Sequence, residues 1–265
     1  MHAFRVAYDG RPFHGFQRQP DVRTVEGALF GALRELGVEF ETKPPGYAAA
    51  GRTDAGVSAL AQTIAFEAPA WLTPAAFTAA LPDSIGVWAE ATVPDDFHAT
   101  HDAVAREYTY HLHAPEASRE RAAEAAALLS GRHDFHNLTP DSEATVRELE
   151  LSVRDDHPYL VITARAGGFS RQLVRRLVSL LEAVAGGDRR TDCIDRVLSD
   201  RPVEGPDGIA PAPAYPLVLT EVRYAVSFQV DEDAAASVSG AFDRLADERR
   251  TAARVAGSIA GGMDV

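Results

Sequence analysis

Apolar side chains in the first hundred residues follow two different spacings. Residues 4–8 and 61–66 place apolar side chains at about every second position, which is typical of β-strands, and residues 85–93 are predicted as a further strand. Thr24 is expected to cap a helix, because the apolar residues after it recur at helical spacing: Val25, Leu29, Leu33 and Leu36. Thr73-Pro74 predicts the start of a second helix.

A second set of elements follows residues 94–96. Residues 104–113 alternate strongly, and because strand side chains alternate with period two, one face of this strand carries four of them: Arg106, Tyr108, Tyr110 and Leu112. Ser170 is expected to cap an amphipathic helix, and the four prolines of residues 206–216 predict an extended loop. The other predicted elements are a helix at 119–129 and strands at 149–153, 159–163 and 217–226.

Helices and strands therefore alternate twice along the chain, with a break near residue 100. The strands are joined by short turns as well as by helical crossovers, which favours mixed, largely antiparallel sheets. We predict an α+β fold of two similar domains, residues 1–100 and 101–230, with helices flanking the sheets and an active-site cleft between the domains. Residues 231–265 are predicted to form a solvated helix and a glycine-rich tail.

The composition is that of a globular protein. Of the 265 residues, 46% are hydrophobic and 25% are charged, and no segment approaches the roughly 18 consecutive apolar residues of a membrane helix. The first ten residues lack a basic stretch followed by an apolar run, so we expect a cytoplasmic protein without a secretory signal. The single cysteine, Cys193, excludes an internal disulfide and a zinc site built from cysteines.

The net charge has the wrong sign for a protein that binds nucleic acid over its whole surface. There are 26 basic and 39 acidic residues, a formal charge of −13, so any site for RNA phosphates must differ locally from the average. Lys43 is the only lysine, which leaves arginine, with its planar bidentate fork, as the main cation.

An acidic, lysine-poor and alanine-rich composition also suggests a high-salt cytoplasm, where the Debye length falls to roughly 3 Å at 1 M salt. We predict that the protein unfolds when it is diluted into low salt, because its acidic groups then repel one another with less screening. Circular dichroism across a salt series would measure this, and full stability without salt would contradict it.

The sequence GRTDAG at residues 51–56 lies between two predicted strands and is flanked by glycines, so it is expected to form an exposed loop. Asp54 in this loop could attack carbon or act as a base, and a neighbouring arginine would keep its carboxylate ionised. The alternative from these residues alone is that Asp54 caps a turn and pairs with Arg52 at the surface.

Five further blocks occur in order around this loop: YDGRPFHGFQRQP at 8–20, TVEGAL at 24–29, PDDFHA at 94–99, REYTY at 106–110 and FSRQLVRRLV at 169–178. Together with GRTDAGVSALAQ at 51–62 they resemble the successive motifs of TruA-type tRNA pseudouridine synthases. The resemblance covers roughly residues 4–226. It implies an isomerase that converts uridine to pseudouridine in the anticodon stem-loop of tRNA, at positions 38 to 40, as a homodimer and without a cofactor.

The resemblance also implies roles for the site residues. Asp54 matches the nucleophile that lets uracil leave the ribose through N1 and rejoin it through C5, and Arg175 matches the arginine that pairs with it. Arg52 matches the arginine that helps to extrude the target base. Tyr108 matches the tyrosine that stacks on the flipped uracil and has been cast as a base for the C5 proton, and Leu217 matches the apolar residue on the other side of the base.

Other positions are weaker candidates. Tyr110 shares the strand face of Tyr108 and ranks second to it, while Arg171 and Arg176 are candidate phosphate contacts near a helix start. These side chains could equally be core or solvated residues. Several histidines have spacings that suggest metal ligands, but no convergent third and fourth ligand is evident, and no metal is expected.

Two other classes of protein remain open. A non-catalytic RNA-binding module could keep this scaffold, although Asp54, Tyr108 and Arg175 are all present. An aspartyl-type hydrolase needs two carboxylates that share a proton, and the sequence contains no second D-[TS]-G motif to supply the partner.

Overall fold

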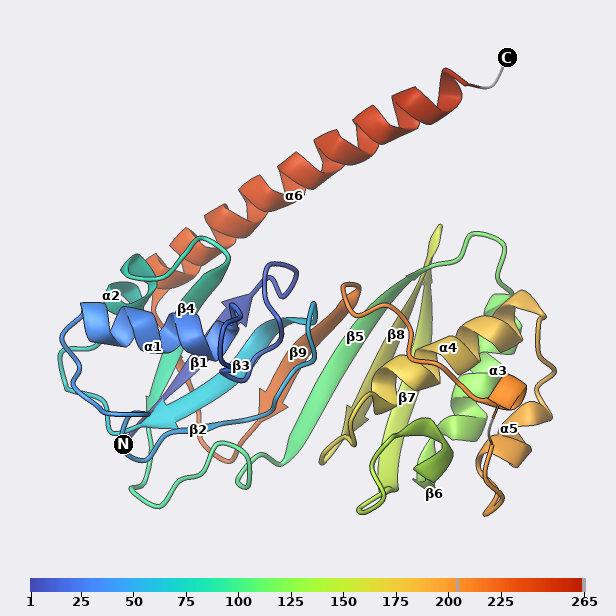
Figure 1. Cartoon of the computed structure of the whole chain (residues 1–265), viewed down its shortest axis with the longest axis horizontal. Helices are drawn as coiled ribbons and strands as arrows, with labels where there is room; N and C mark the ends of the chain where they lie inside the picture. The colour runs from blue at the N-terminus through green and yellow to red at the C-terminus, as the bar shows by residue number, and fades with distance from the viewer. Residues whose placement is uncertain (204, 264–265) are drawn as a thin grey trace.

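The computed structural model describes residues 1–203 and 205–263. Ten strands form one sheet in the order β10-β4-β1-β3-β9-β5-β8-β7-β6, with β2 paired to β3 (Figure 1). The first half contains β1 (His2–Tyr8), α1 (Val25–Glu35), β2 (Ala48–Ala49), β3 (Ser58–Phe66), α2 (Pro74–Ala79) and β4 (Ile85–Thr92).

The second half begins with β5 (Ala105–His113), α3 (Arg119–Leu129), β6 (Gly131–Asp134) and the 3-10 turn η1 (His136–Leu138). It continues with β7 (Val146–Asp156), β8 (Tyr159–Ala166), α4 (Leu173–Gly186), α5 (Cys193–Val197) and the 3-10 turn η2 (Gly205–Asp207). It ends with β9 (Leu217–Arg223), β10 (Gln229–Val230) and α6 (Glu232–Gly261).

The predicted α+β class with a mostly antiparallel, mixed sheet is confirmed. The structure differs in joining both halves through one continuous sheet, because β9 pairs antiparallel with β5 and parallel with β3. The parallel pairing is short and involves only Ser58 with Val218 and Ala59 with Leu219. The division into residues 1–100, 101–230 and 231–265 stays a prediction.

Three apolar clusters lie along this sheet, and the two larger ones, one in each half, meet at β9. In the first half, α1 buries Val25, Leu29, Phe30 and Leu33 against the sheet, and Thr24 caps the helix by accepting a hydrogen bond from the Gly27 amide. In the second half, α3 and α4 cover β5, β8 and β7. Leu217 of β9 packs into the second core, whereas Leu219 packs into the first. Strand β9 therefore links the two halves, since it pairs with a strand of each and contributes side chains to both cores.

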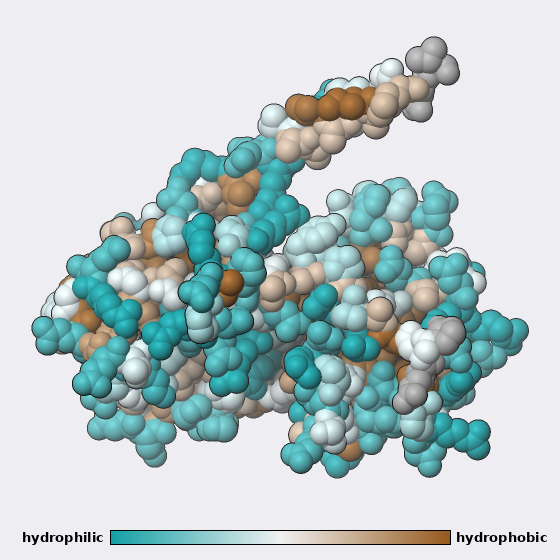
Figure 2. All heavy atoms as spheres, viewed as in Figure 1, coloured by the Kyte–Doolittle hydropathy of each residue, from teal (hydrophilic) through white to brown (hydrophobic). Residues whose placement is uncertain are grey.

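The C-terminal helix α6 is solvated over most of its length, and only its first part packs against the body. Its first turns lie on β4, where Ala234 and Val238 are buried, and Gly86 permits this contact because a Cβ atom there would collide with Val238. Further along, Arg249 forms an ion pair of 2.6 Å with the buried carboxylate of Asp9. Beyond that point the helix extends away from the body (Figures 1 and 2).

Candidate functional site

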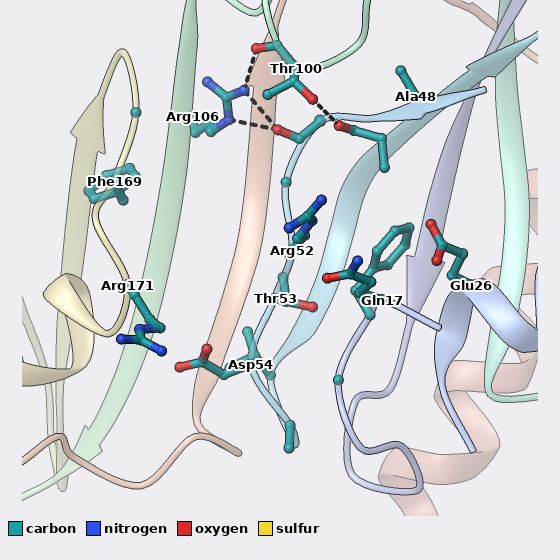
Figure 3. A pocket seen from close by; sticks show the side chains of 18 of the residues that line it. Gln17, Glu26, Ala48, Arg52, Thr53, Asp54, Thr100, Arg106, Phe169 and Arg171 are labelled. Carbon is teal, nitrogen blue, oxygen red and sulfur yellow. Dashed lines mark hydrogen bonds between the residues drawn. The ribbon is translucent and has the colours of Figure 1, made fainter. Parts of the chain in front are cut away.

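A cavity of about 1330 Å³ lies between the two halves, with walls from both of them (Figure 3). From the first half it is lined by residues 14–19 and 47–55, and from the second by Tyr108, residues 168–175 and Leu217. The cavity therefore occupies the place that was predicted for a cleft between the halves.

The loop of residues 51–56 crosses the cavity between β2 and β3, and hydrogen bonds from several elements hold it. The Thr53 hydroxyl bonds to the Tyr8 hydroxyl at 2.8 Å in the buried core, and the Thr53 carbonyl accepts from the Phe16 amide at 3.1 Å. Gln62, which is fully buried, donates to the Gly51 carbonyl at 2.8 Å. These contacts leave the Asp54 side chain directed into the cavity (Figure 3).

Asp54 and Arg175 form an ion pair across the cavity. The Arg175 Nη1 atom donates to Asp54 Oδ2 at 3.0 Å, and the side chains are 16% and 32% exposed, respectively. Arg175 also donates from Nε to the Ala212 carbonyl at 2.7 Å, so the loop that precedes β9 fixes the guanidinium. Arg175 lies in the first turn of α4, which follows Gln172 in a left-handed conformation with φ of 61°. The carboxylate is therefore held by a cation from the other half of the protein.

Tyr108 lies on the adjoining wall, on β5. Its ring meets the Phe169 ring edge-on, with centroids 5.2 Å apart and an interplanar angle of 89°. Burial raises the pKa of Tyr108 to about 12; the Arg106 charge opposes this shift and the Asp54 charge adds to it. Tyr108 is therefore a neutral phenol near pH 7.

Tyrosine burial predicts a loss of stability in alkali. Burial is the main cause that raises the pKa of Tyr108, Tyr110 and Tyr224 to about 12, above the ordinary value near 10. Between these two pKa values the folded state keeps phenol protons that the unfolded state releases. The contribution of the neutral buried phenols to the free energy of unfolding is therefore complete below pH 10 and is lost as the pH rises through 12. Thermal melting from pH 9 to pH 12 should show a falling Tm.

Replacing Tyr108→Phe removes one of these groups, so the Tm of the variant should fall less steeply over that interval. Tyr159→Phe is the matched control, since the Tyr159 residue is 41% exposed, and its curve should follow that of the wild type. Parallel curves for Tyr108→Phe and the wild type would contradict the assigned burial effect.

Three more of the predicted site residues line the same cavity. Arg52 is exposed, and no hydrogen bond or ion pair joins its side chain to another described residue. Arg171 lines the cavity and pairs with Asp141 at 3.4 Å. Leu217 is 4% exposed and lies at the start of β9. The structure thus brings together Asp54, Tyr108, Arg175, Arg52, Leu217 and Arg171.

Two predicted residues do not line the cavity. Tyr110 is 2% exposed and packs in the second core, because α4 covers this part of the β5 face. Arg176 follows Arg175 in α4, and because successive residues of a helix are rotated by about 100° around its axis, the two side chains point in different directions. The Arg176 guanidinium donates to the Ile209 carbonyl and to Oε1 of Gln172, which itself lines the cavity. Both side chains therefore lie outside the set of residues that line the cavity, and their roles in RNA binding stay predictions.

Other lining residues were not singled out from the sequence as site residues. Gln17, His98, Arg106 and Phe169 all occur within the quoted blocks, so the motifs contained the signal for these positions. Arg147 lies outside every block, and no local pattern sets it apart.

The cavity is basic in a strongly acidic protein. Seven of its lining residues are basic: Arg18, Lys43, Arg52, Arg106, Arg147, Arg171 and Arg175. Only two are acidic, Asp54 and Glu26, against a net charge of −13 for the chain. Glu26 accepts a hydrogen bond from the Arg18 amide at 2.8 Å. The local charge therefore suits an anionic ligand.

Two kinds of feature are absent from the described part of the chain. Within residues 1–203 and 205–263, no cluster of three or more histidine, cysteine, aspartate or glutamate side chains has an arrangement that could hold a metal ion. In the same residues, none of the helices combines the length and the apolar character that crossing a bilayer requires.

Comparisons with known proteins agree on one family. Residues 125–225 match the family described as "tRNA pseudouridine synthase". The chain is 62% identical over 262 residues to the tRNA pseudouridine synthase A of Halobacterium salinarum, covering 97% of this chain and 98% of that relative. Against the protein of the same name from Haloarcula marismortui the identity is 57%, over 99% and 100% of the two chains.

A more distant relative from Methanosarcina barkeri, also named tRNA pseudouridine synthase A, is 40% identical over 87% of each chain. A chain from the solved structure of a Cbf5-Nop10-Gar1 complex matches 83% of this chain and 58% of its own length, at 10% identity and a TM-score of 0.38. The curated relatives span nearly the full chain and confirm the resemblance that the motifs indicated. The chain therefore belongs to the tRNA pseudouridine synthase A family.

Proposed function

We propose that this isomerase forms pseudouridine in the anticodon stem-loop of tRNA, at positions 38 to 40, with Asp54 as the nucleophile. Membership in the family supports pseudouridine synthesis itself. The observation that supports Asp54 is its ion pair with Arg175, 3.0 Å long, inside a basic cavity between the two halves.

The reaction requires an enclosed cavity, because a uridine stacked in RNA hides its glycosidic bond. Taking the nucleotide out of its stack costs a few kcal/mol, and one aromatic platform returns about 1–3 kcal/mol per base. Tyr108 offers such a ring and Leu217 an apolar surface in the same cavity. We propose that the target uracil lies between these two side chains, and that Arg52, exposed at the cavity, occupies the space which the base leaves in the RNA.

The isomerisation breaks the bond between uracil N1 and ribose C1′ and forms a bond from C5 to the same carbon. C5 loses a proton and N1 gains one, so the reaction balances without an oxidant, a reductant or a cofactor. In our proposal the Asp54 carboxylate attacks the nucleotide while Arg175 keeps it charged and aimed. A neutral Tyr108 phenol is a weak base, so the pKa of about 12 favours stacking as its main role.

We also propose that the protein acts as a homodimer in the cytoplasm. The resemblance implies the dimer, and the outer half of α6 leaves large apolar side chains uncovered in the single chain, among them Val255 at 56% and Ile259 at 61% exposed (Figure 2). Analytical ultracentrifugation of the pure protein measures the assembly, and a single species of 28.4 kDa would reject the dimer.

The substrate proposal is tested with unmodified tRNA transcripts. Purified protein should introduce pseudouridine at positions 38 to 40, and transcripts with cytidine at these positions should remain unmodified. Pseudouridine at other positions would redirect the substrate assignment. RNA binding without any pseudouridine would identify a non-catalytic RNA-binding module instead.

A further inference from the structure

Arg106 makes contacts that no proposed step uses. It lies on β5, two residues before Tyr108 on the same face, and four of its N–H groups donate to main-chain carbonyls. Nε and Nη2 donate to the Ala50 carbonyl at 3.1 and 2.7 Å, and Nη2 also donates to the Thr100 carbonyl at 2.7 Å (Figure 3). Nη1 donates to the Gly167 carbonyl at 2.7 Å.

These three carbonyls belong to three separate segments of the chain. Ala50 immediately precedes the loop that carries Asp54, and Thr100 belongs to the segment that joins the two halves. Gly167 begins the segment of residues 167–172, which carries Phe169 against Tyr108 and leads into α4 with Arg175. Thr100 extends the network, since its hydroxyl donates to the Ala49 carbonyl at 2.6 Å. One guanidinium thus joins both walls of the cavity.

The same geometry argues against Arg106 as a phosphate contact. A guanidinium has five N–H donors, and the protein backbone already uses four of them. Arg106 also has no ion pair with a carboxylate among the described residues, so its positive charge is held in the cavity by carbonyl dipoles alone. That charge opposes the rise of the Tyr108 pKa.

We propose that Arg106 is a positioning residue that sets the Asp54 loop against the segment of residues 167–172, and thereby fixes the distance between Asp54 and the base platform. This inference rests on the proposed function. Lysine cannot replace Arg106 in this role, because an ammonium is a compact point charge and lacks the planar fork that reaches three carbonyls at once.

The test compares Arg106→Lys and Arg106→Gln with Arg165→Lys. Arg165 lies on the neighbouring strand β8, opposite Glu107 in the register, and pairs with Glu150 at 3.8 Å outside the cavity. Three quantities are measured: kcat and Kd on unmodified tRNA, and hydrogen–deuterium exchange of residues 50–56 and 167–172. Melting curves establish that each variant is folded at the temperature of the assay.

For both Arg106 variants we expect faster exchange in the two segments and a kcat about 10- to 100-fold lower, because small misplacements of reacting groups cost such factors. The tRNA Kd should stay within about twofold, as four of five donors are unavailable to RNA. Arg165→Lys should match the wild type in all three quantities.

Unchanged exchange in both segments would overturn the proposal, as would a Kd that rises while kcat is preserved, since Arg106 would then be an RNA contact. Failure of the proposed function can be told apart from failure of the proposed role of Arg106. In the first case the wild type would form no pseudouridine, and the hydrogen–deuterium exchange data would still decide whether Arg106 holds the two segments together.

Discussion

Asp54→Asn should abolish pseudouridine formation, with a fall in kcat of at least about 10³-fold, while tRNA binding stays within about threefold of the wild type. Asparagine has nearly the shape of aspartate and can still accept a hydrogen bond from Arg175, so the loop should keep its conformation. The amide carries no negative charge and is a poor nucleophile, so only the chemical step is lost. Single-turnover assays with saturating enzyme measure the rate, and filter binding measures the affinity.

The matched control is Asp156→Asn at the exposed end of β7, where the aspartate pairs with Arg154 at 3.4 Å. In the strand order of the sheet, β7 is well separated from β3, which follows the loop of residues 51–56. This control removes the same charge and should leave the rate unchanged. A rate for Asp54→Asn within tenfold of the wild type would exclude Asp54 as the nucleophile.

Arg175→Met is expected to have the second largest effect, a fall in kcat of about 10²- to 10³-fold. It removes the 3.0 Å ion pair to Asp54 and the 2.7 Å hydrogen bond to the Ala212 carbonyl, so the carboxylate loses its cation and the loop before β9 loses an anchor. Arg175→Lys restores the charge but cannot make both bonds, because they come from different nitrogen atoms of one planar group. It should recover only part of the rate.

Because Arg175 is only 16% exposed, its variants are also expected to melt at lower temperature, and the rates must be compared where every variant is folded. Arg154→Met, on the exposed part of β7, controls for the loss of an arginine elsewhere. Equal rates for Arg175→Met and the wild type would show that Asp54 works without its partner.

The local pattern of the chain predicted the elements that bury a regular apolar face. Alternation located β1 and β5, and helical spacing after Thr24 located α1, because apolar side chains of each element pack into one of the two main cores. It did not indicate β2 and β10, which have two residues each, or β6, whose sequence is Gly-Arg-His-Asp. Strands that are this short or this polar depend on partners distant in sequence for their hydrogen bonds.

Long-range pairing explains the remaining differences. The continuous sheet depends on two residue pairs between β3 and β9, about 160 positions apart, and no local pattern encodes such a register. Alternation correctly placed Tyr110 on the face of Tyr108, but it could not show that α4 covers Tyr110. The proximity of Asp54 and Arg175, which are 121 positions apart, was implied only by the family resemblance.

The central claim is that a uridine extruded from tRNA reaches Asp54 in the cavity between the two halves. An experimental structure of the Asp54→Asn variant bound to an unmodified tRNA tests it most directly. We predict that a uridine from positions 38 to 40 lies between Tyr108 and Leu217, with its glycosidic carbon or C6 in contact with the side chain at position 54. A tRNA bound on another face, with this cavity empty, would contradict the account.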